Sequence, residues 1–443
     1  MATNFWPWII GLAAAYPLAW EALQINGRPV DVVASDLLIM LILLVPMGGS
    51  LRIPAGVSLK RLATVRVAAV VFMLYALGLA FTVYGGTADM SRIVSASKLT
   101  KPIFFVLLGT YIARTVPPLI ALKRVGTAFA LIVFATIGSA VLSPGFPRTA
   151  FGANLFGTRL YGYPNSAMSF YAVMLPLLIA SADTKSRGMR RWFYYGAIGF
   201  TALIVVSSLS RSSTLVMVFG GLTYLFITGR GHVPIVCSSF VAVGVVASAG
   251  LLFNLDIQNE AVLQLKENVE KRYSQTVGAE DPLSGRAGIW ADTLGLAADR
   301  PIFGYAFESY HHHSTFDTPH QQYLEILYKT GGLGLVLYFW LLFSALGGVR
   351  HLSQHVAVRS DGWYFLKALF ASFAAAMVGN LSQPNLTYSI TGNCLFLMVG
   401  LMLNRNGAAS LVDPPSVPAS VGSTPLGLPQ HSFPGRLTTP QGA

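Results

Sequence analysis

Long apolar runs alternate with short polar segments along almost the whole chain. A helix rises about 1.5 Å per residue, so crossing about 30 Å of hydrocarbon takes roughly 20 mostly apolar residues. Runs of that length predict about twelve transmembrane helices. The predicted spans are 6–23, 32–48, 67–84, 102–120, 126–143, 166–182, 192–209, 212–228, 233–253, 331–348, 363–380 and 388–403.

One stretch interrupts this pattern. Between the apolar runs that end near Leu252 and begin near Gly332, the residues are polar and mixed, and 11 of the 18 acidic residues lie from Asp256 to Glu325. We expect two helical pieces within it, one near 257–274 and one opening at Ser284. A chain that otherwise crosses a bilayer keeps one large water-facing segment here, and chemistry is expected in that segment.

The pattern divides the chain into four parts and predicts an all-α polytopic membrane protein with a large helical loop outside the membrane. The C-terminal part is rich in Pro, Ser and Gly with almost no aromatic residues, so it cannot bury enough apolar surface to offset the entropy of ordering. The predicted parts are 1–253 with transmembrane helices 1–9, 254–330 as an outward loop or cap, 331–403 with helices 10–12, and 404–443 as a disordered tail.

Composition agrees with a membrane protein. The chain has 443 residues, of which 53% are hydrophobic and 11% charged, with a mean hydropathy of +0.58, whereas soluble domains carry about 25% charged residues. The net charge of +12 implies no nucleic acid, because topology signals and anionic lipid account for it. Cys237 and Cys394 both fall in predicted spans, so neither a disulfide framework nor a metal-binding spacing is predicted.

Basic residues gather in alternate loops, which by the positive-inside rule face the cytoplasm. Both termini are then cytoplasmic and the long polar loop is periplasmic. The first apolar run is predicted to be a retained helix, since no small-residue cleavage site follows it. The basic residues of the inner loops are Arg52, Lys60, Arg61, Lys123, Arg124, Lys185, Arg187, Arg190, Arg191, Arg230, Arg350 and Arg359.

The segment Thr318-Pro319-His320-Gln321 predicts a helix start, with Thr318 as N-cap, Pro319 at the first helical position and Gln321 completing a capping box. His320 then lies in the first turn, where the positive end of the helix dipole disfavours imidazolium. A neutral histidine is a competent general base. The alternative is an interfacial histidine that only forms hydrogen bonds.

Two arginines are predicted near helix starts. Arg211 lies in the tight turn of residues 208–213 between two spans, and Arg286 follows Ser284-Gly285. Unpaired backbone donors beside a bidentate guanidinium suit a phosphate group. For Arg211, snorkelling to lipid headgroups is the alternative.

Two other outward loops carry positive charge. Residues 85–101, with Lys98, are compatible with an amphipathic segment at the membrane interface. Residues 144–165, with Arg159, end at Asn165, which is predicted to cap the next helix.

The run His311-His312-His313 does not predict a metal site, because consecutive helical positions point in different directions and no Cys or carboxylate pattern completes a tetrahedral set. Glu280-Asp281, before Pro282, is interpreted as a solvated turn.

Taken together, these segments resemble the O-antigen ligase (WaaL) family, within a wider group of O-antigen ligase and polymerase membrane proteins. His320-Gln321, followed after nine residues by Gly331-Gly332-Leu333-Gly334, is similar to the family's histidine and spaced-glycine signature. The resemblance covers roughly residues 60–403. Other similar segments are Ser210-Arg211, Gly285-Arg286, Gly162-Tyr163-Pro164-Asn165 and Pro301-Ile302-Phe303-Gly304.

The resemblance implies a GT-C-like glycosyltransferase in the inner membrane of a Gram-negative bacterium, with its active site on the periplasmic side. It implies transfer of O-antigen glycan from undecaprenyl diphosphate to a sugar hydroxyl of the lipid A core. Our hypothesis for the mechanism is a single displacement with inversion that requires no metal or other cofactor. His320 is then the general base, Arg211 and Arg286 bind the diphosphate, and Lys98 and Arg159 are weaker candidates for the same electrostatic patch. The expected partners are the lipid-linked donor, the lipid A core acceptor and membrane lipids.

Several alternatives share these features. An O-antigen polymerase or a protein O-oligosaccharyltransferase uses the same donor with another acceptor. A peptidoglycan polymerase is a further alternative, although no acidic residue stands out in the outward loop. A lipid or polysaccharide transporter predicts charges near mid-membrane and paired broken helices, whereas the notable charges here cluster on the outer side.

Overall fold

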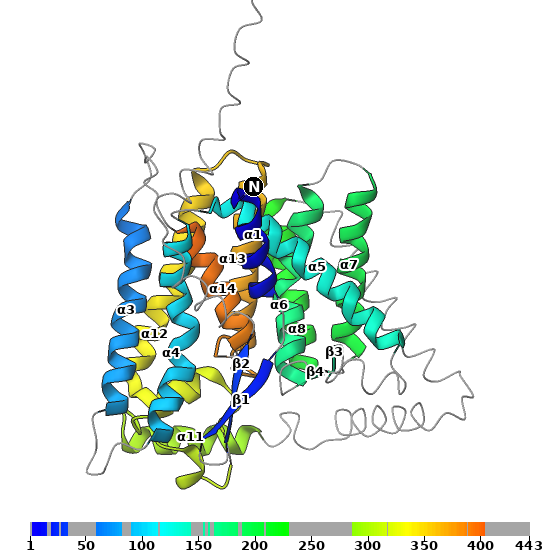
Figure 1. Ribbon diagram of the computed structural model, residues 1–443. Helices are drawn as coiled ribbons and strands as arrows, with labels where there is room; N and C mark the ends of the chain where they lie inside the picture. The colour runs from blue at the N-terminus through cyan, green and yellow to red at the C-terminus, as the bar shows by residue number, and fades with distance from the viewer. Residues whose placement is uncertain are drawn as a thin grey trace, which may run out of the picture.

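A computed structural model describes most of the chain, and the part it describes is mainly helical (Figure 1). Apart from the helices, the described residues hold two small antiparallel strand pairs. The described residues are 2–15, 19–25, 28–33, 59–81, 90–113, 116–142, 154–155, 158–159, 164–184, 188–207, 210–229, 286–316, 318–387 and 389–403.

Five of the described helices are long and apolar enough to cross a membrane, and further shorter helices are also apolar. The protein is therefore a helical membrane protein. The five long helices are α3 (Leu59–Phe81), α4 (Met90–Ile112), α5 (Pro118–Leu142), α12 (Gln322–Gln354) and α13 (Asp361–Gly379). The others are α1 (Ala2–Ala15), α6 (Pro164–Asp183), α7 (Met189–Ser207), α8 (Arg211–Thr228), α11 (Arg286–Asp299) and α14 (Ser389–Met402).

Small residues allow the helices of the bundle to pack closely. Helix α4 lies against α14 and α3, α6 lies against α7, α8 and α13, and α12 lies against α3 and α13. A Cβ at Gly109 of α4 would lie 2.3 Å from the Leu397 carbonyl oxygen, and one at Gly400 of α14 would lie 2.1 Å from the Val106 carbonyl oxygen. These contacts exclude any side chain, so the glycines set how closely α4 and α14 approach.

The predicted span 6–23 is wrong in its second half. Helix α1 ends at Ala15, and strand β1 (Ala19–Ile25) pairs antiparallel with β2 (Arg28–Val33). Ile25 pairs with Arg28, which leaves Asn26-Gly27 between the strands, and this dipeptide favours a two-residue hairpin connection. The turn signal outweighs the apolar composition of 19–23.

Residues 90–101 belong to a helix rather than to the outward loop 85–101 that was predicted. Helix α4 runs from Met90 to Ile112 and contains Pro102, where the predicted span 102–120 begins. Lys98 is therefore an exposed residue of α4. Asn165 is likewise not a cap, because α6 begins one residue earlier, at Pro164.

Helix α12 begins nine residues before the predicted span 331–348 and contains a kink. Gly331 has φ 68° and ψ −173°, a non-helical conformation that divides α12 in two. The apolar part after Gly331 starts at the predicted position, and a further helical segment, 322–330, precedes it. Left-handed backbone of this kind favours glycine, because it lacks a Cβ.

We call residues 286–321 the cap, and they lie at one end of the bundle (Figure 1). A turn of the cap packs against the kink. Gly304, with φ 64°, faces Gly331; added Cβ atoms would lie 2.4 Å from the Tyr328 oxygen and 2.1 Å from the Ile302 oxygen, respectively. Gly304 and Gly331, which we call the glycine pair, therefore let the two backbones touch.

The cap turn also bonds the backbone groups around the kink. In an unbroken helix, the carbonyls of Tyr328 and Lys329 pair with the amides of Gly332 and Leu333; here the cap turn bonds all four, which keeps them satisfied. The bonds are Tyr305 N to Tyr328 O (2.8 Å), Phe307 N to Lys329 O (3.3 Å), Gly332 N to Pro301 O (2.7 Å) and Leu333 N to Ile302 O (3.3 Å).

Tyrosines fill the interior of the cap. Tyr305 stacks on Tyr328 with ring centroids 4.8 Å apart, and Tyr310 meets the same ring edge-on at 5.0 Å. Burial raises the pKa of Tyr310, and burial followed by the charge of Asp299 raises that of Tyr305. Both phenols therefore stay neutral at physiological pH.

Some predictions fall outside the described residues. They are the span 233–253, most of the span 32–48, the helical piece near 257–274, the Glu280-Asp281 turn, Cys237 and the tail 404–443. The number of twelve spans and the position of the polar loop relative to the membrane remain predictions.

Candidate active site

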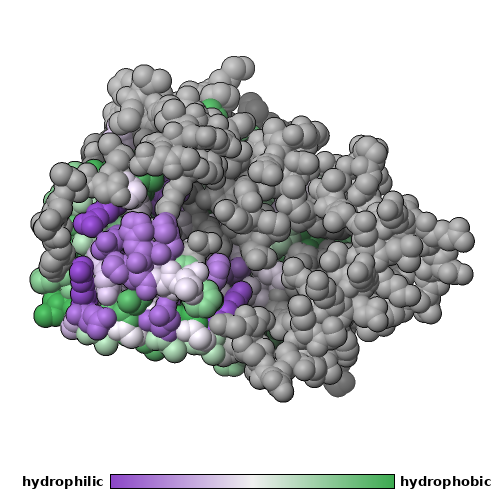
Figure 2. Space-filling view, turned by 90° about the horizontal axis from the view of Figure 1, so that it is seen from below, coloured by the Kyte–Doolittle hydropathy of each residue, from purple (hydrophilic) through white to green (hydrophobic). Residues whose placement is uncertain are grey.

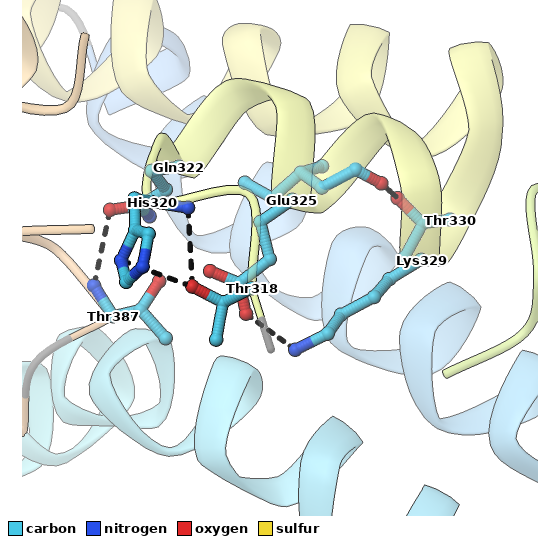
Figure 3. A network of polar contacts seen from close by, with 8 residues as sticks. Thr318, His320, Gln322, Glu325, Lys329, Thr330 and Thr387 are labelled. Carbon is cyan, nitrogen blue, oxygen red and sulfur yellow. Dashed lines mark hydrogen bonds and ion pairs between the residues drawn. The ribbon is translucent and has the colours of Figure 1, made fainter. Parts of the chain in front are cut away.

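His320 lies just before α12, in an unusual backbone conformation (Figure 3). Helix α12 begins at Gln322, and its N-cap is Gln321, whose side chain accepts from Leu324 N at 2.5 Å. The predicted capping box is therefore wrong. His320 has φ 51°, a left-handed conformation that costs a non-glycine residue about 1–3 kcal/mol.

Thr318 supports His320 instead of capping the helix. Its Oγ1 accepts from the His320 amide at 3.2 Å and lies 3.3 Å from Nδ1 of the ring. A hydroxyl oxygen can accept two hydrogen bonds, so Nδ1–H can also donate to it. In that tautomer Nε2 carries the lone pair that a base needs. The side chains of both residues are exposed.

Gln322, two residues after His320, is buried and connects three parts of the molecule. Its side-chain oxygen accepts from Leu386 N at 2.9 Å and Thr387 N at 3.3 Å, and its side-chain nitrogen donates to the Tyr338 hydroxyl. Its backbone amide donates to the Asn380 carbonyl at 3.0 Å. The start of α12 is therefore fixed to residues 380–387, which follow α13 and which we call the amide loop.

Arg286 reaches the same loop from the cap. It is the first residue of α11, and its Nη1 donates to the Ser382 carbonyl at 3.0 Å. A guanidinium offers five N–H donors, so this bond uses only part of its capacity. The predicted helix start near Ser284 is confirmed to within two residues.

The start of α8 joins the loop through hydroxyl groups. Ser210 caps α8 and donates to Ser213 Oγ at 2.9 Å, and Ser213 lies 3.4 Å from Ser169 Oγ of α6. Gln383 of the amide loop donates to Ser169. Arg211 is the first residue of α8; its side chain lies outside the described part.

Three predicted residues thus belong to segments linked to the amide loop. The starts of α11, with Arg286, and α12, with His320, bond to it directly, and the start of α8, with Arg211, is linked through Ser169 of α6. The other two lie in other elements. Lys98 is on α4, and Arg159 is in strand β4 (Thr158–Arg159), which pairs with β3 (Asn154–Leu155) and whose side chains are outside the described part.

Sequence reasoning missed the amide loop. It follows the predicted span 363–380 and reads Asn380-Leu381-Ser382-Gln383-Pro384-Asn385. Three amide side chains within six residues at the end of an apolar span are a signal that could have found it, because such groups are costly near lipid without partners.

Asn385 is fully buried, and neither polar atom of its amide has a hydrogen-bond partner among the described residues. The buried hydroxyl of Thr387, drawn beside the His320 ring in Figure 3, also has none there. An unsatisfied buried polar group costs about 1–3 kcal/mol. The amide loop therefore keeps polar groups that could bond a substrate.

The cap also presents a hydrophilic face at this end of the molecule (Figure 2). His312 and His313 face Glu308, with N to O distances of 4.0 and 3.4 Å, and Arg92 of α4 lies 3.8 Å from the same carboxylate. In the part of the chain that is described, no group of three or more His, Cys, Asp or Glu residues is arranged to hold a metal ion.

Comparison with known proteins gives one family match. Residues 196–339 match the model of the family described as O-Antigen ligase. This match, over less than half of the chain, supports membership of the O-antigen ligase superfamily. The matched segment contains Arg211, Arg286, His320 and the glycine pair, whereas the amide loop follows it. Members of this superfamily are transferases of lipid-linked glycans.

A solved structure is also similar in part. One chain from work described as "Structural coordination of polymerization and crosslinking by a peptidoglycan synthase complex" aligns over 81% of this chain and 99% of its own length, with 17% identity and a TM-score of 0.45. A likeness at that level assigns neither fold nor activity. No curated protein matches the chain.

Proposed function

We propose that the protein is an O-antigen ligase, which transfers a glycan from undecaprenyl diphosphate to a sugar hydroxyl of the lipid A core. The observation that carries the proposal is that the starts of α11 and α12 bond to the amide loop directly and the start of α8 is linked to it through Ser169 of α6, and these three starts bring two arginines and a histidine. All three residues lie in the segment that matches the family. Exposed apolar helices give both lipid-linked substrates access from the bilayer.

In the proposed reaction, Nε2 of His320 takes the proton of the acceptor hydroxyl while its oxygen attacks the anomeric carbon. The bond from that carbon to the diphosphate oxygen breaks, and the electron pair leaves with undecaprenyl diphosphate. A single displacement of this kind inverts the anomeric configuration. In the proposed tautomer Nδ1–H donates to Thr318 Oγ1, which leaves Nε2 as the basic nitrogen.

Charge stabilisation is the second requirement, because the leaving group departs as an anion. Arg211 and Arg286 each begin a helix, where unpaired backbone N–H groups and the positive end of the dipole favour phosphate oxygens. The two guanidiniums bind the diphosphate, and Lys98 and Arg159 add positive charge at longer range. This scheme places the chemistry on protein side chains and needs no metal.

The test is transfer by the purified protein with three acceptors: lipid A core, a second lipid-linked repeat and a pilin-like peptide. We expect glycosylation of lipid A core, undiminished by excess chelator. His320→Ala should lose about 10²- to 10⁴-fold in rate, as expected for a general base, while retaining donor binding. Undiminished transfer by His320→Ala removes the base assignment.

The same assay separates the alternatives. Elongation of the second lipid-linked repeat instead of the core identifies a polymerase, and glycosylation of the peptide identifies a protein O-oligosaccharyltransferase. Movement of the intact donor across a sealed vesicle without transfer to any acceptor identifies a transporter.

A further inference from the structure

Gln322 is buried, yet every polar group of its side chain is used. It is 1% exposed, and its oxygen accepts two backbone amides of the amide loop while its nitrogen donates to Tyr338. A buried amide whose oxygen and nitrogen are both hydrogen-bonded is well determined in position, because a shift leaves a polar atom unpaired.

His320 needs such support. Its left-handed φ of 51° is a strained conformation that persists only where surrounding contacts hold it. Thr318 holds it from the N-terminal side. On the C-terminal side, the first residue with long-range contacts is Gln322, which reaches Leu386, Thr387 and Tyr338.

Resting on the proposed function, we propose that Gln322 is a positioning residue that sets the distance between His320 and the amide loop. The loop is bonded in turn to Arg286 and, through Ser169, to the α8 start that carries Arg211. The hydrogen bonds of Gln322 therefore hold the base, His320, at a fixed distance from the residues that bind the diphosphate.

The neighbouring Gln321 provides a matched control. It is also a glutamine beside His320, but its side chain caps α12 by accepting from Leu324 N. Removal of this N-cap hydrogen bond weakens the start of α12 but leaves the bonds to the amide loop in place. A loss of function specific to Gln322 thus separates positioning from helix stability.

The first variants are Gln322→Met, which keeps side-chain length without polar atoms, and Gln321→Ala. We expect Gln322→Met to lower kcat at least tenfold with the donor KM within about twofold. Gln321→Ala should lower the melting temperature but keep kcat within about twofold. Equal kcat in Gln322→Met and wild type, or equal losses in both variants, overturns the proposal.

Tyr338→Phe is the second variant, which serves also if Gln322→Met does not fold. Tyr338 lies sixteen residues beyond Gln322 in α12, is fully buried and accepts a hydrogen bond from the Gln322 side chain. We expect kcat to fall about two- to fivefold with unchanged KM, and no further fall when the change is added to Gln322→Met. An unchanged kcat in Tyr338→Phe contradicts the inference.

Hydrogen exchange at the Leu386 and Thr387 amides gives a readout that does not depend on activity. Both amides donate to Gln322, so they should exchange faster in Gln322→Met and unchanged in Gln321→Ala. Faster exchange with full kcat shows a bond without a positioning role and overturns the proposal. Absence of transfer in wild type with every acceptor refutes the proposed function instead, while the exchange result still tests the bond.

Discussion

At the scale of the residue, His320 combines backbone strain with an exposed ring, a combination that stability alone does not favour. Asn adopts a left-handed backbone more readily than most larger residues do. We expect His320→Asn to keep or raise the free energy of unfolding, by up to about 1 kcal/mol, and to lose transfer. Thermal unfolding in detergent and the transfer assay measure the two effects. A variant that is destabilised and partly active contradicts the view that strain here serves catalysis.

Arg286 is the residue for which the identity of the cation matters most. Its Nη1 already donates to the Ser382 carbonyl, and a planar fork can bond that carbonyl and a phosphate oxygen together, whereas an ammonium is a point charge. We expect Arg286→Lys to raise the donor KM about tenfold, or ~1.4 kcal/mol, with a smaller effect on kcat. Titration with donor at saturating acceptor measures both. A donor KM equal to that of wild type indicates that the guanidinium binds the loop only.

At the scale of the element, the kink in α12 depends on the glycine pair. A methyl group at Gly331 meets both a left-handed φ and the Ile302 carbonyl oxygen at 2.1 Å, and a strained φ alone costs about 1–3 kcal/mol. We expect Gly331→Ala to lower the unfolding free energy by at least that amount. It should also reduce transfer, because the added methyl group pushes the cap turn away from the kink.

Gly347 of the same helix is the control for that prediction. An added Cβ there has no neighbour within 4 Å, so Gly347→Ala should stabilise α12 by about 0.5–1 kcal/mol without changing transfer. Melting temperatures of the two variants should move in opposite directions. A shift of the same sign and size in both contradicts the role given to the kink.

The helix ends show where sequence reasoning succeeds. The apolar runs located α6, α7, α8, α13 and α14 to within a few residues, because a membrane span is defined by its own composition. Helices α3, α4 and α5 begin about two to three turns before the predicted spans 67–84, 102–120 and 126–143, and α4 already ends at Ile112. The errors at α1 and α12 have a common cause: each boundary depends on contacts with other segments. After α1 the chain pairs as strands β1 and β2 instead of continuing as a helix, and the cap turn bonds the backbone groups at the kink in α12.

The site was predictable only in part for the same reason. Arg211, Arg286 and His320 carry local signals of helix starts, and the structure has helix starts at or next to all three. Gln322 and Ser169 have no local signal, since their importance comes from bonds between residues 64 and 214 positions apart. Pattern reasoning finds charged groups at element ends, but not the buried amides that hold those ends together.

At the scale of the whole molecule, the candidate site and the connection between α12 and α13 lie at opposite ends of the bundle. Helix α12 runs away from His320 to Gln354, and α13 returns from Asp361 to the amide loop. If the site is periplasmic, Val358, which is 73% exposed in that connection, faces the cytoplasm. Each position therefore reports one side of the membrane.

Single cysteines test this arrangement in a background with Cys237 and Cys394 replaced by Ala. We expect an impermeant maleimide to label His320→Cys in intact spheroplasts and Val358→Cys only after permeabilisation, because both side chains are exposed but on different sides. The reverse pattern contradicts the periplasmic site. Labelling of residue 320 from both sides in vesicles supplied with donor contradicts a ligase as well, because alternating access belongs to transport and a fixed site bonded through the amide loop does not provide it.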